Sequence, residues 1–187
     1  MKIVAVLNRM ENSKEIDSYY LNAIKEFGGV PLLINESNIK LLKLCGGILL
    51  TGGDNKGKLD DYLIKYALDN KLPLLGICQG MQSMALYGTD NELINVDNHY
   101  KKNHLVILND SKLKSIIRKD CVTVNSFHHS KVISSKIFDI VGYSEDKVIE
   151  AIENKNHPFQ IGVEWHPERM IDDESSQKIF ENFIKNI

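Results

Sequence analysis

The chain is poor in arginine and has no long apolar run. Three arginines stand beside 20 lysines among its 187 residues, the formal net charge is −2, and no basic block occurs. Partners such as nucleic acid or a membrane surface usually require a concentrated basic patch, so this charge pattern argues against both. No apolar stretch approaches the roughly 18 residues that span a bilayer. The apolar run at residues 3–7 predicts a first β-strand rather than a signal peptide.

Cysteine is also scarce. Cys45, Cys78 and Cys121 are an odd number at wide spacings, which is typical neither of a disulfide framework nor of a CxxC redox or zinc pair. No pair among the histidines and Cys121 has the usual zinc-ligand spacing, so we expect neither a metal nor another cofactor. Free thiols predict a reducing cytoplasm as the location. The histidines expected on the surface or in loops are His99, His104 and His157.

The first half of the chain alternates short apolar runs with amphipathic segments. This order is typical of an α/β protein in which helices cover both faces of a parallel sheet. The length lies within the range of one domain, and we expect residues 1–187 to form one. The predicted strands are residues 2–7, 30–34, 47–50 and 72–77, and the predicted helices are residues 13–27 with Ser13 as cap, 37–43, 59–69 and 79–87.

After Tyr87, strand-like runs follow one another with few helices between them. They predict antiparallel additions to the parallel core, at residues 105–108, 122–125, 138–143, 148–152 and 160–164. A last amphipathic helix, capped by Ser175 or Ser176, buries apolar residues at 179, 180, 183 and 184. The expected fold is therefore a three-layer α/β/α sandwich with a mostly parallel central sheet and antiparallel additions.

The segment Gly-Ile-Cys-Gln-Gly-Met-Gln at residues 76–82 predicts a cysteine on a strand-to-helix elbow. Gly76 and Gly80 lie two residues before and after Cys78, where a tightly folded backbone needs small residues. The helix N-terminus there is expected to favour the thiolate, and the N–H of Gln79 to stabilise an oxyanion. The flanking glycines favour a nucleophile over a buried structural cysteine.

A second segment, Glu-Trp-His-Pro-Glu at residues 164–168, follows a predicted strand. Residues two apart near a strand end can lie on one face, and Pro167 fixes the backbone between them, so Glu168 can hold the imidazole of His166. Such a histidine is a general base to a thiol and a general acid to a leaving amine. Alone the segment could be a surface turn with incidental charges, but together with an elbow cysteine it predicts a triad of Cys78, His166 and Glu168.

A glycine-rich corner, Thr-Gly-Gly-Asp, follows the predicted strand at residues 47–50. Neighbouring parallel strands place their C-terminal ends together, so this corner can adjoin the elbow and supply the N–H of Gly53 as a second oxyanion donor. A tight turn that needs glycine for positive φ is the alternative. A phosphate loop is disfavoured because neither of the usual glycine-rich phosphate patterns is present.

These motifs, in this chain order, resemble the class I glutamine amidotransferase superfamily with its Cys-His-Glu triad, over essentially the whole chain. Within the superfamily, residues 124–129, residues 162–168 and the Asn8-Arg9 pair resemble the γ-glutamyl hydrolase branch, whose best-known members cleave γ-glutamyl-γ-aminobutyrate. The resemblance implies a flavodoxin-like fold and cysteine-dependent hydrolysis of a γ-glutamyl amide through a thioester, with a small-molecule substrate.

The same resemblance assigns roles to individual residues. It makes Cys78 the nucleophile and His166 and Glu168 its partners, with Gly53 and Gln79 as oxyanion donors. Since neighbours in a regular strand point to opposite faces, at most one of the two adjacent histidines enters the pocket, and parity with the serine before them favours the first. Arg9, at a strand end, is expected to bind an acidic leaving group. The predicted substrate contacts are Gln82, Ser126, His128, His129 and Arg9.

The pattern departs from the branch at two positions. The branch often has arginine or cysteine at Gln79 and glutamine at Ser130, and the stretch after Tyr87 is shorter than in the aminobutyrate hydrolases. Compact members act on γ-glutamyl adducts in phosphoramidate metabolism for surface or capsule polysaccharide, which makes γ-glutamyl-CDP-amidate a candidate substrate. The main alternative is a glutaminase subunit that passes ammonia to a separate synthase. A catalytically silent binding module is disfavoured because all three triad residues are present.

Overall fold

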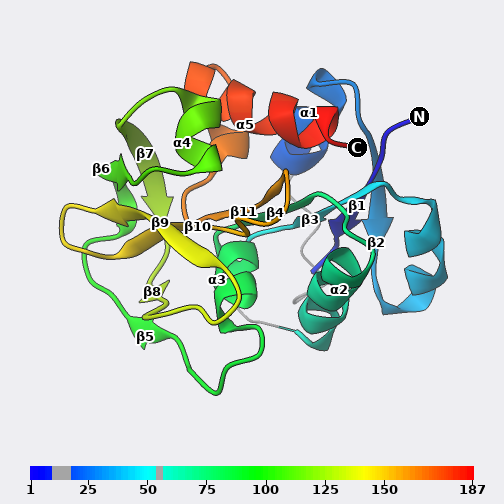
Figure 1. Cartoon of the computed structure of the whole chain (residues 1–187), viewed down its shortest axis with the longest axis horizontal. Coiled ribbons are helices and arrows are strands. Elements are labelled where there is room, and N and C mark those ends of the chain that lie inside the picture. The colour runs from blue at the N-terminus through cyan, green and yellow to red at the C-terminus, as the bar shows by residue number, and fades with distance from the viewer. Residues whose placement is uncertain (10–17, 54–56) are drawn as a thin grey trace.

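The computed structural model describes residues 1–9, 18–53 and 57–187, and its elements are shown in Figure 1. The strands are β1 (Ile3–Leu7), β2 (Val30–Ile34), β3 (Gly47–Leu50), β4 (Leu74–Ile77), β5 (Ile94–Asn95), β6 (Tyr100–Leu108), β7 (Cys121–Phe127), β8 (Ser130–Lys131), β9 (Asp139–Ser144), β10 (Ile149–Glu153) and β11 (Gln160–Val163). The helices are α1 (Ser18–Glu26), α2 (Lys58–Asp69), α3 (Gln79–Leu86), α4 (Lys112–Ile117) and α5 (Glu174–Lys185), with 3-10 helices η1 (Glu36–Leu44) and η2 (Pro167–Arg169).

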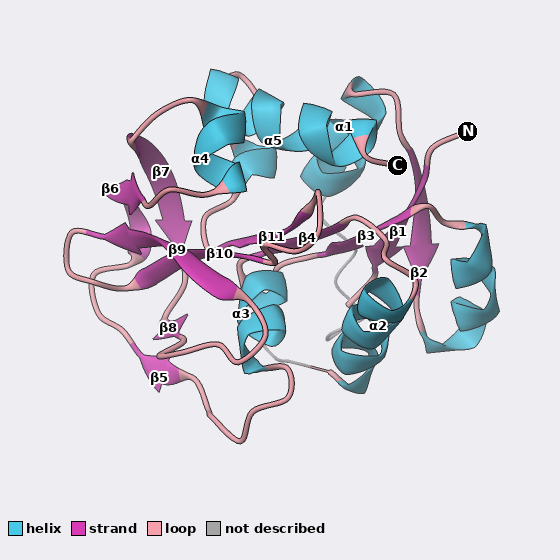
Figure 2. Cartoon of the chain, in the orientation of Figure 1, coloured by secondary structure: helices cyan, strands magenta, loops and turns pink. Residues whose placement is uncertain are grey.

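The elements form the predicted three-layer α/β/α sandwich. A nine-stranded sheet in the order β2-β1-β3-β4-β11-β10-β9-β6-β7 is the middle layer. Helices α1, α4 and α5 lie on one side of it and α2 and α3 on the other (Figure 2). Strands β3 and β4 carry no polar side chain and are buried along their whole length, because helices cover both of their faces. Two apolar clusters, one on each side of the sheet, make up the core.

The sheet is parallel from β2 to β11 and antiparallel from β10 to β7. The prediction of a mostly parallel core with antiparallel additions is confirmed, but its assignment of β11 to the additions is wrong. Gly162 lies beside Gly76 and Val163 beside Ile77 in a parallel register. The chain reverses after β10, so β11 runs in the direction of β4 and enters the centre of the sheet. Its C-terminal end therefore adjoins the elbow.

One predicted helix start is wrong and another is not tested. Ser13, the predicted cap of the first helix, lies outside the described residues. The cap of α5 is Asp173 rather than Ser175 or Ser176, and its carboxylate accepts hydrogen bonds from the backbone N–H groups of both serines. A carboxylate at this position satisfies two orphan donors and complements the helix dipole, which a serine hydroxyl does less well. Among the described residues, no helix combines the length and the apolarity that a bilayer crossing requires.

Candidate active site

Cys78 occupies a strained backbone turn between β4 and α3. Its φ of 51° and ψ of −112° lie in a region that residues with a side chain rarely adopt. The backbone is held there by a hydrogen bond of 2.8 Å from the N–H of Cys78 to the carbonyl of Val163 on β11. Strain of this kind is typical of a nucleophile elbow, where it directs the side chain away from the sheet.

The two glycines flanking the elbow have no room for a side chain. A Cβ on Gly80 would lie 2.2 Å from the carbonyl oxygen of Leu50, and a Cβ on Gly76 would lie 2.5 Å from the sulfur of Met84. Contacts this short do not occur between real atoms. Both glycines are therefore required by the close approach of α3 to β3 and β4, as the sequence predicts.

His166 is held by Glu168, which lies two residues later in the chain. The two residues flank Pro167, which begins η2, and Nδ1 of His166 lies 2.6 Å from Oε1 of Glu168. Both side chains are buried. Because an ionised carboxylate only accepts hydrogen bonds, Nδ1 carries the hydrogen, and Nε2 of the neutral ring is left with a lone pair. That nitrogen can accept a proton from a thiol.

Cys78 and His166 face a common point beside Gly52, at the end of β3. A Cβ on Gly52 would lie 3.1 Å from Cε1 of His166 and 3.6 Å from Cβ of Cys78. The three residues come from the C-terminal ends of adjacent parallel strands, β3, β4 and β11. The strand order thus joins a cysteine and a histidine that lie far apart in the sequence. It also explains why the corner after β3 has glycine at position 52.

Burial raises the pKa of the Cys78 thiol well above its ordinary value. The nearby carboxylates of Glu164, Glu168 and Glu150 raise it further, and the backbone N–H of Gln79 acts in the opposite direction. The predicted preference for the thiolate is therefore wrong as a net effect, because burial and the nearby carboxyl groups outweigh the one backbone donor, Gln79. The resting thiol is neutral, and its proton must pass to a base during reaction.

The two predicted oxyanion donors directly follow Cys78 and Gly52 in the chain. The N–H of Gln79 acts on the sulfur of Cys78, while Gly53 follows Gly52, the glycine next to Cys78 and His166. Gly52 itself donates its N–H to the hydroxyl of Tyr20 at 2.9 Å, so that group is engaged. Asp54, the last residue of the predicted corner, lies outside the described residues.

Three of the predicted substrate contacts are engaged within the protein. Arg9 pairs with the carboxylate of Asp60 through both terminal nitrogens. The side-chain amide of Gln82 donates to the carbonyl of Ser130 at 3.1 Å and to a carboxylate oxygen of Glu164. The hydroxyl of Ser126 donates to a backbone carbonyl at 2.5 Å. Contact of these residues with substrate stays a prediction.

The adjacent histidines lie between β7 and β8 rather than within a strand, and only the first of them is buried. His128 is buried, whereas His129 is exposed and stacks on Tyr100 with ring centroids 4.2 Å apart. His128 meets His99 at 3.2 Å rather than the triad. His99 lies in the loop directly before β6, as expected, but it is buried, with 3% of its surface exposed. The expectation of a surface or loop position is wrong for His104, which lies within β6 with its side chain 15% exposed.

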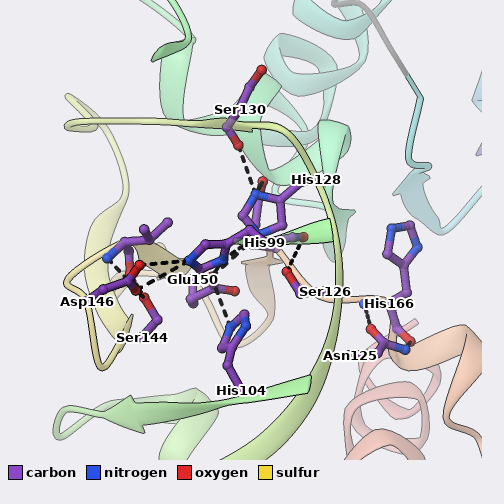
Figure 3. Close-up of polar contacts among 12 residues, drawn as sticks. His99, His104, Asn125, Ser126, His128, Ser130, Ser144, Asp146, Glu150 and His166 are labelled. Atoms are coloured by element: carbon purple, nitrogen blue, oxygen red, sulfur yellow. Dashed lines mark hydrogen bonds and ion pairs between the residues drawn. The ribbon is translucent and has the colours of Figure 1, made fainter. Parts of the chain in front are cut away.

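Sequence reasoning missed the role of Asn125. Its side-chain amide donates to the carbonyl oxygen of His166 at 2.9 Å and accepts from the N–H of His166 at 2.8 Å (Figure 3). The ring of Phe127 meets His166 edge-on at 5.8 Å. Both residues lie in the segment that carries the resemblance, but nothing in their spacing indicates contact with a loop 40 residues later.

A cavity of about 480 Å³ lies beside this site. It is lined by residues that follow β1 and β2 and by the first turn of α2. Arg9 is one of the lining residues, and its side chain lies next to Gly53. In open α/β sheets, ligands bind outside the carboxyl ends of the strands. The cavity occupies that position, next to the expected oxyanion donor.

Comparison with known proteins places these features in a family. Residues 55–168 match the family described as peptidase C26, which is well over half of the chain. The chain belongs to the peptidase C26 family. This confirms the predicted class I glutamine amidotransferase-like superfamily and its γ-glutamyl hydrolase branch, and membership supports a hydrolase.

Two relatives of this C26 member have names that state different activities. The chain is 28% identical to gamma-glutamyl-gamma-aminobutyrate hydrolase PuuD of Escherichia coli (strain K12), over 97% of this chain and 91% of the relative. It is 32% identical to a glutamine-hydrolysing GMP synthase subunit of Methanococcus aeolicus, over 83% of this chain and 79% of the relative.

A solved structure shares the fold of this C26 member. A putative GMP synthase subunit from Thermoplasma acidophilum superposes with a TM-score of 0.78 at 22% identity, covering 99% of this chain and 93% of that one. The alignment with the Escherichia coli hydrolase runs over 232 positions, more than the 187 residues present here. Segments of that hydrolase therefore have no counterpart in this chain.

Proposed function

We propose that this protein hydrolyses a γ-glutamyl amide bond through a γ-glutamyl thioester on Cys78. The observation that carries the proposal is the convergence of Cys78 and His166 on Gly52, with His166 held by Glu168 at 2.6 Å. An elbow nucleophile, a base with a free lone pair and a carboxylate that orients the base are the parts that acyl transfer requires.

The reaction starts from a neutral thiol, because the pKa of Cys78 is raised. His166 takes the thiol proton on Nε2 as the sulfur attacks the γ-carbonyl carbon, and the oxyanion is stabilised by the N–H groups of Gly53 and Gln79. His166 then gives the proton to the leaving nitrogen, the C–N bond breaks, and the thioester remains. Each proton transfer of this kind contributes roughly 10²–10⁴-fold to the rate.

Water completes the cycle. His166 removes a proton from a water molecule, whose oxygen attacks the thioester carbonyl, and the same two N–H groups stabilise the second oxyanion. The C–S bond breaks, the sulfur recovers a proton from His166, and glutamate leaves. Every group that moves a proton belongs to this chain.

For the substrate we propose an N-substituted γ-glutamyl amide. The likeness to a γ-glutamyl-γ-aminobutyrate hydrolase and the Asn-Ser-x-His-His segment at residues 125–129 support this choice. This chain lacks segments that the hydrolase has, which favours a different leaving group. The candidate substrate is γ-glutamyl-CDP-amidate, from phosphoramidate metabolism for capsule polysaccharide.

The second candidate is a glutaminase subunit that supplies ammonia to a separate synthase. The likeness to the glutamine-hydrolysing subunit of a GMP synthase favours it, since such a subunit performs the same thioester chemistry with glutamine. The two candidates differ in the nitrogen compound that is released and in the need for a partner protein. The roles of the triad are the same in both.

A substrate panel separates the two candidates. Release of glutamate is measured with glutamine, γ-glutamyl-γ-aminobutyrate and a γ-glutamyl phosphoramidate, and the Cys78→Ala variant gives the background. A hydrolase turns over an N-substituted amide at least tenfold faster than glutamine with no other protein present. Preference for glutamine supports the subunit instead. Equal release by the Cys78→Ala variant would overturn both.

A further inference from the structure

Three histidines and a glutamate gather in a buried cluster apart from the triad (Figure 3). His99 precedes β6, His104 lies within β6, His128 follows β7, and Glu150 comes from β10. The exposed fractions of His99, His128 and Glu150 are 3%, 4% and 0%. We call these four residues the histidine cluster. The catalytic mechanism uses none of them.

Three ligand atoms of the histidine cluster form a small triangle. Nδ1 of His99 lies 3.2 Å from Nε2 of His128 and 3.4 Å from Oε1 of Glu150, and the third side, from His128 to Glu150, measures 3.6 Å. A tetrahedral ion with bonds of roughly 2.0–2.1 Å separates its ligand atoms by about 3.3–3.4 Å. The triangle therefore has the size of one face of such a tetrahedron.

The outer nitrogens of both histidines have acceptors as partners. Nε2 of His99 lies 3.1 and 3.3 Å from the two carboxylate oxygens of Asp146, and Nδ1 of His128 lies 2.9 Å from the carbonyl oxygen of Ser130. Because these acceptors favour a hydrogen on each outer nitrogen, loss of the second ring proton would leave the lone pair on the inner nitrogen, which faces the triangle. Metal-binding histidines are oriented in this way by carboxylates and carbonyls.

Glu150 gives the second, independent indication. Within the described part of the chain, neither of its carboxylate oxygens receives a well-aligned hydrogen bond, although the side chain is fully buried and three histidine nitrogens lie 3.1–3.6 Å from Oε1. Nor do the ring nitrogens of His104 make a hydrogen bond there, although Nε2 lies 3.1 Å from Oε1 of Glu150. A buried carboxylate in this position requires a positive charge nearby, which either a metal ion or a protonated histidine of the cluster would supply.

We propose that the inner nitrogens of His99 and His128 and a carboxylate oxygen of Glu150 bind one divalent transition-metal ion, with Zn²⁺ the best match. Two imidazoles and one carboxylate suit zinc, whereas calcium and magnesium prefer sites made of oxygen alone. His104, which approaches the same carboxylate, is the residue nearest to a fourth position. The ligands come from separate segments, so the sequence spacing that argued against a metal could not reveal them.

The ion has a structural role in this proposal. It joins β10 to the residues that flank β6 and β7, and Nδ1 of His128 also lies 3.3 Å from Glu164, two residues before His166. The same strand β7 carries Asn125, which holds the backbone of His166. A bound ion would thus stiffen the half of the sheet that positions the catalytic base.

Zinc binding is measured on the Cys78→Ala protein, which removes the catalytic thiol as a competing ligand. After treatment with a chelator, equilibrium dialysis against ZnCl₂ is expected to give one equivalent per chain. Glu150→Gln, which keeps the shape of the side chain, should weaken binding at least 100-fold. The matched control, His129→Ala, removes the exposed histidine next to His128 and should bind as the parent does.

Two further readouts need no variant in the cluster. Co²⁺ in place of Zn²⁺ should give visible absorption bands typical of a tetrahedral site in the Cys78→Ala parent, and saturating Zn²⁺ should raise the thermal midpoint by about 5–10 °C at 100 times the Kd. Binding below one equivalent in the parent, a Co²⁺ spectrum of a hexa-aqua type, or equal binding by Glu150→Gln and His129→Ala would overturn the proposal. Enzymatic activity enters none of these measurements.

Discussion

Asn125 holds His166 by its backbone rather than by its ring. The side-chain amide satisfies both the N–H and the carbonyl of His166, at 2.8 and 2.9 Å, and both residues are buried. Glu168 holds the ring from the other side. Backbone and imidazole are therefore fixed by separate residues, from β7 and from η2, before any substrate arrives.

Replacing Asn125 by alanine should loosen the base without removing it. Two buried backbone groups lose their partners, so we expect a loss of about 1–3 kcal/mol in the free energy of unfolding. Misplacement of His166 should lower kcat roughly 10–100-fold with little change in KM. Urea unfolding and steady-state kinetics measure both. The control is Asn103→Ala, because Asn103 is exposed and lies opposite Asn125 on the neighbouring strand. It should change neither quantity. An equal loss in both variants would contradict the role of Asn125.

A methyl group at Gly80 should prevent the elbow from forming. The added Cβ would lie 2.2 Å from a carbonyl oxygen of β3, and backbone must move to relieve the contact. We expect Gly80→Ala to lower the free energy of unfolding by about 3 kcal/mol or more. Gly57→Ala is the control, because its nearest contact would be an ordinary 3.5 Å. Similar unfolding curves for the two variants would show that the corner is not as tight as described.

The neutral amide in Glu168→Gln should leave the fold intact and impair catalysis. A glutamine cannot stabilise the imidazolium of His166, and its NH₂ group favours the wrong tautomer of the ring. We expect kcat to fall by about 10²–10⁴-fold, measured as initial rates of glutamate release. Glu174→Gln, an exposed glutamate in the first turn of α5, serves as the matched control. A kcat within twofold of the parent would remove Glu168 from the mechanism.

The raised pKa of Cys78 predicts an alkaline rise in its reactivity. Only the thiolate reacts with iodoacetamide, and a pKa above the ordinary 9.0 means that the thiolate fraction still increases about tenfold per pH unit up to that point. Without substrate, the rate of alkylation at Cys78 should rise through pH 9 without a plateau. Peptide mapping separates this site from Cys45 and Cys121, with Cys78→Ala as the blank. A plateau below pH 8 would mean that the resting thiol is already ionised.

Short sequence patterns were sufficient to predict the parallel core and the elbow. The apolar runs around Gly47 and Leu74 are buried on both faces, and such runs give a clear signal whatever their partners are. The glycines at positions 76 and 80 are needed because neighbouring backbone leaves no room, which depends mainly on nearby residues. Both features could therefore be predicted from short segments.

Features that depend on distant residues could not be predicted. The direction of β11 depends on a reversal after β10, and the burial of His99 depends on how far β6 extends. The pKa of Cys78 depends on burial and on carboxyl groups from β10, from the end of β11 and from η2. These groups come close to the thiol only when the chain folds. Asn125 likewise finds its partner only across the folded sheet.

Trapping the acyl-enzyme tests the central claim most directly. The protein is mixed with its best γ-glutamyl substrate, quenched in acid within the first turnover, and digested for peptide mass mapping. We predict a glutamyl group, labile to hydroxylamine, on the peptide that contains Cys78 and on no other cysteine, and its absence in Cys78→Ala. Sustained turnover with no adduct on Cys78, or undiminished turnover by Cys78→Ala, would contradict the thioester mechanism.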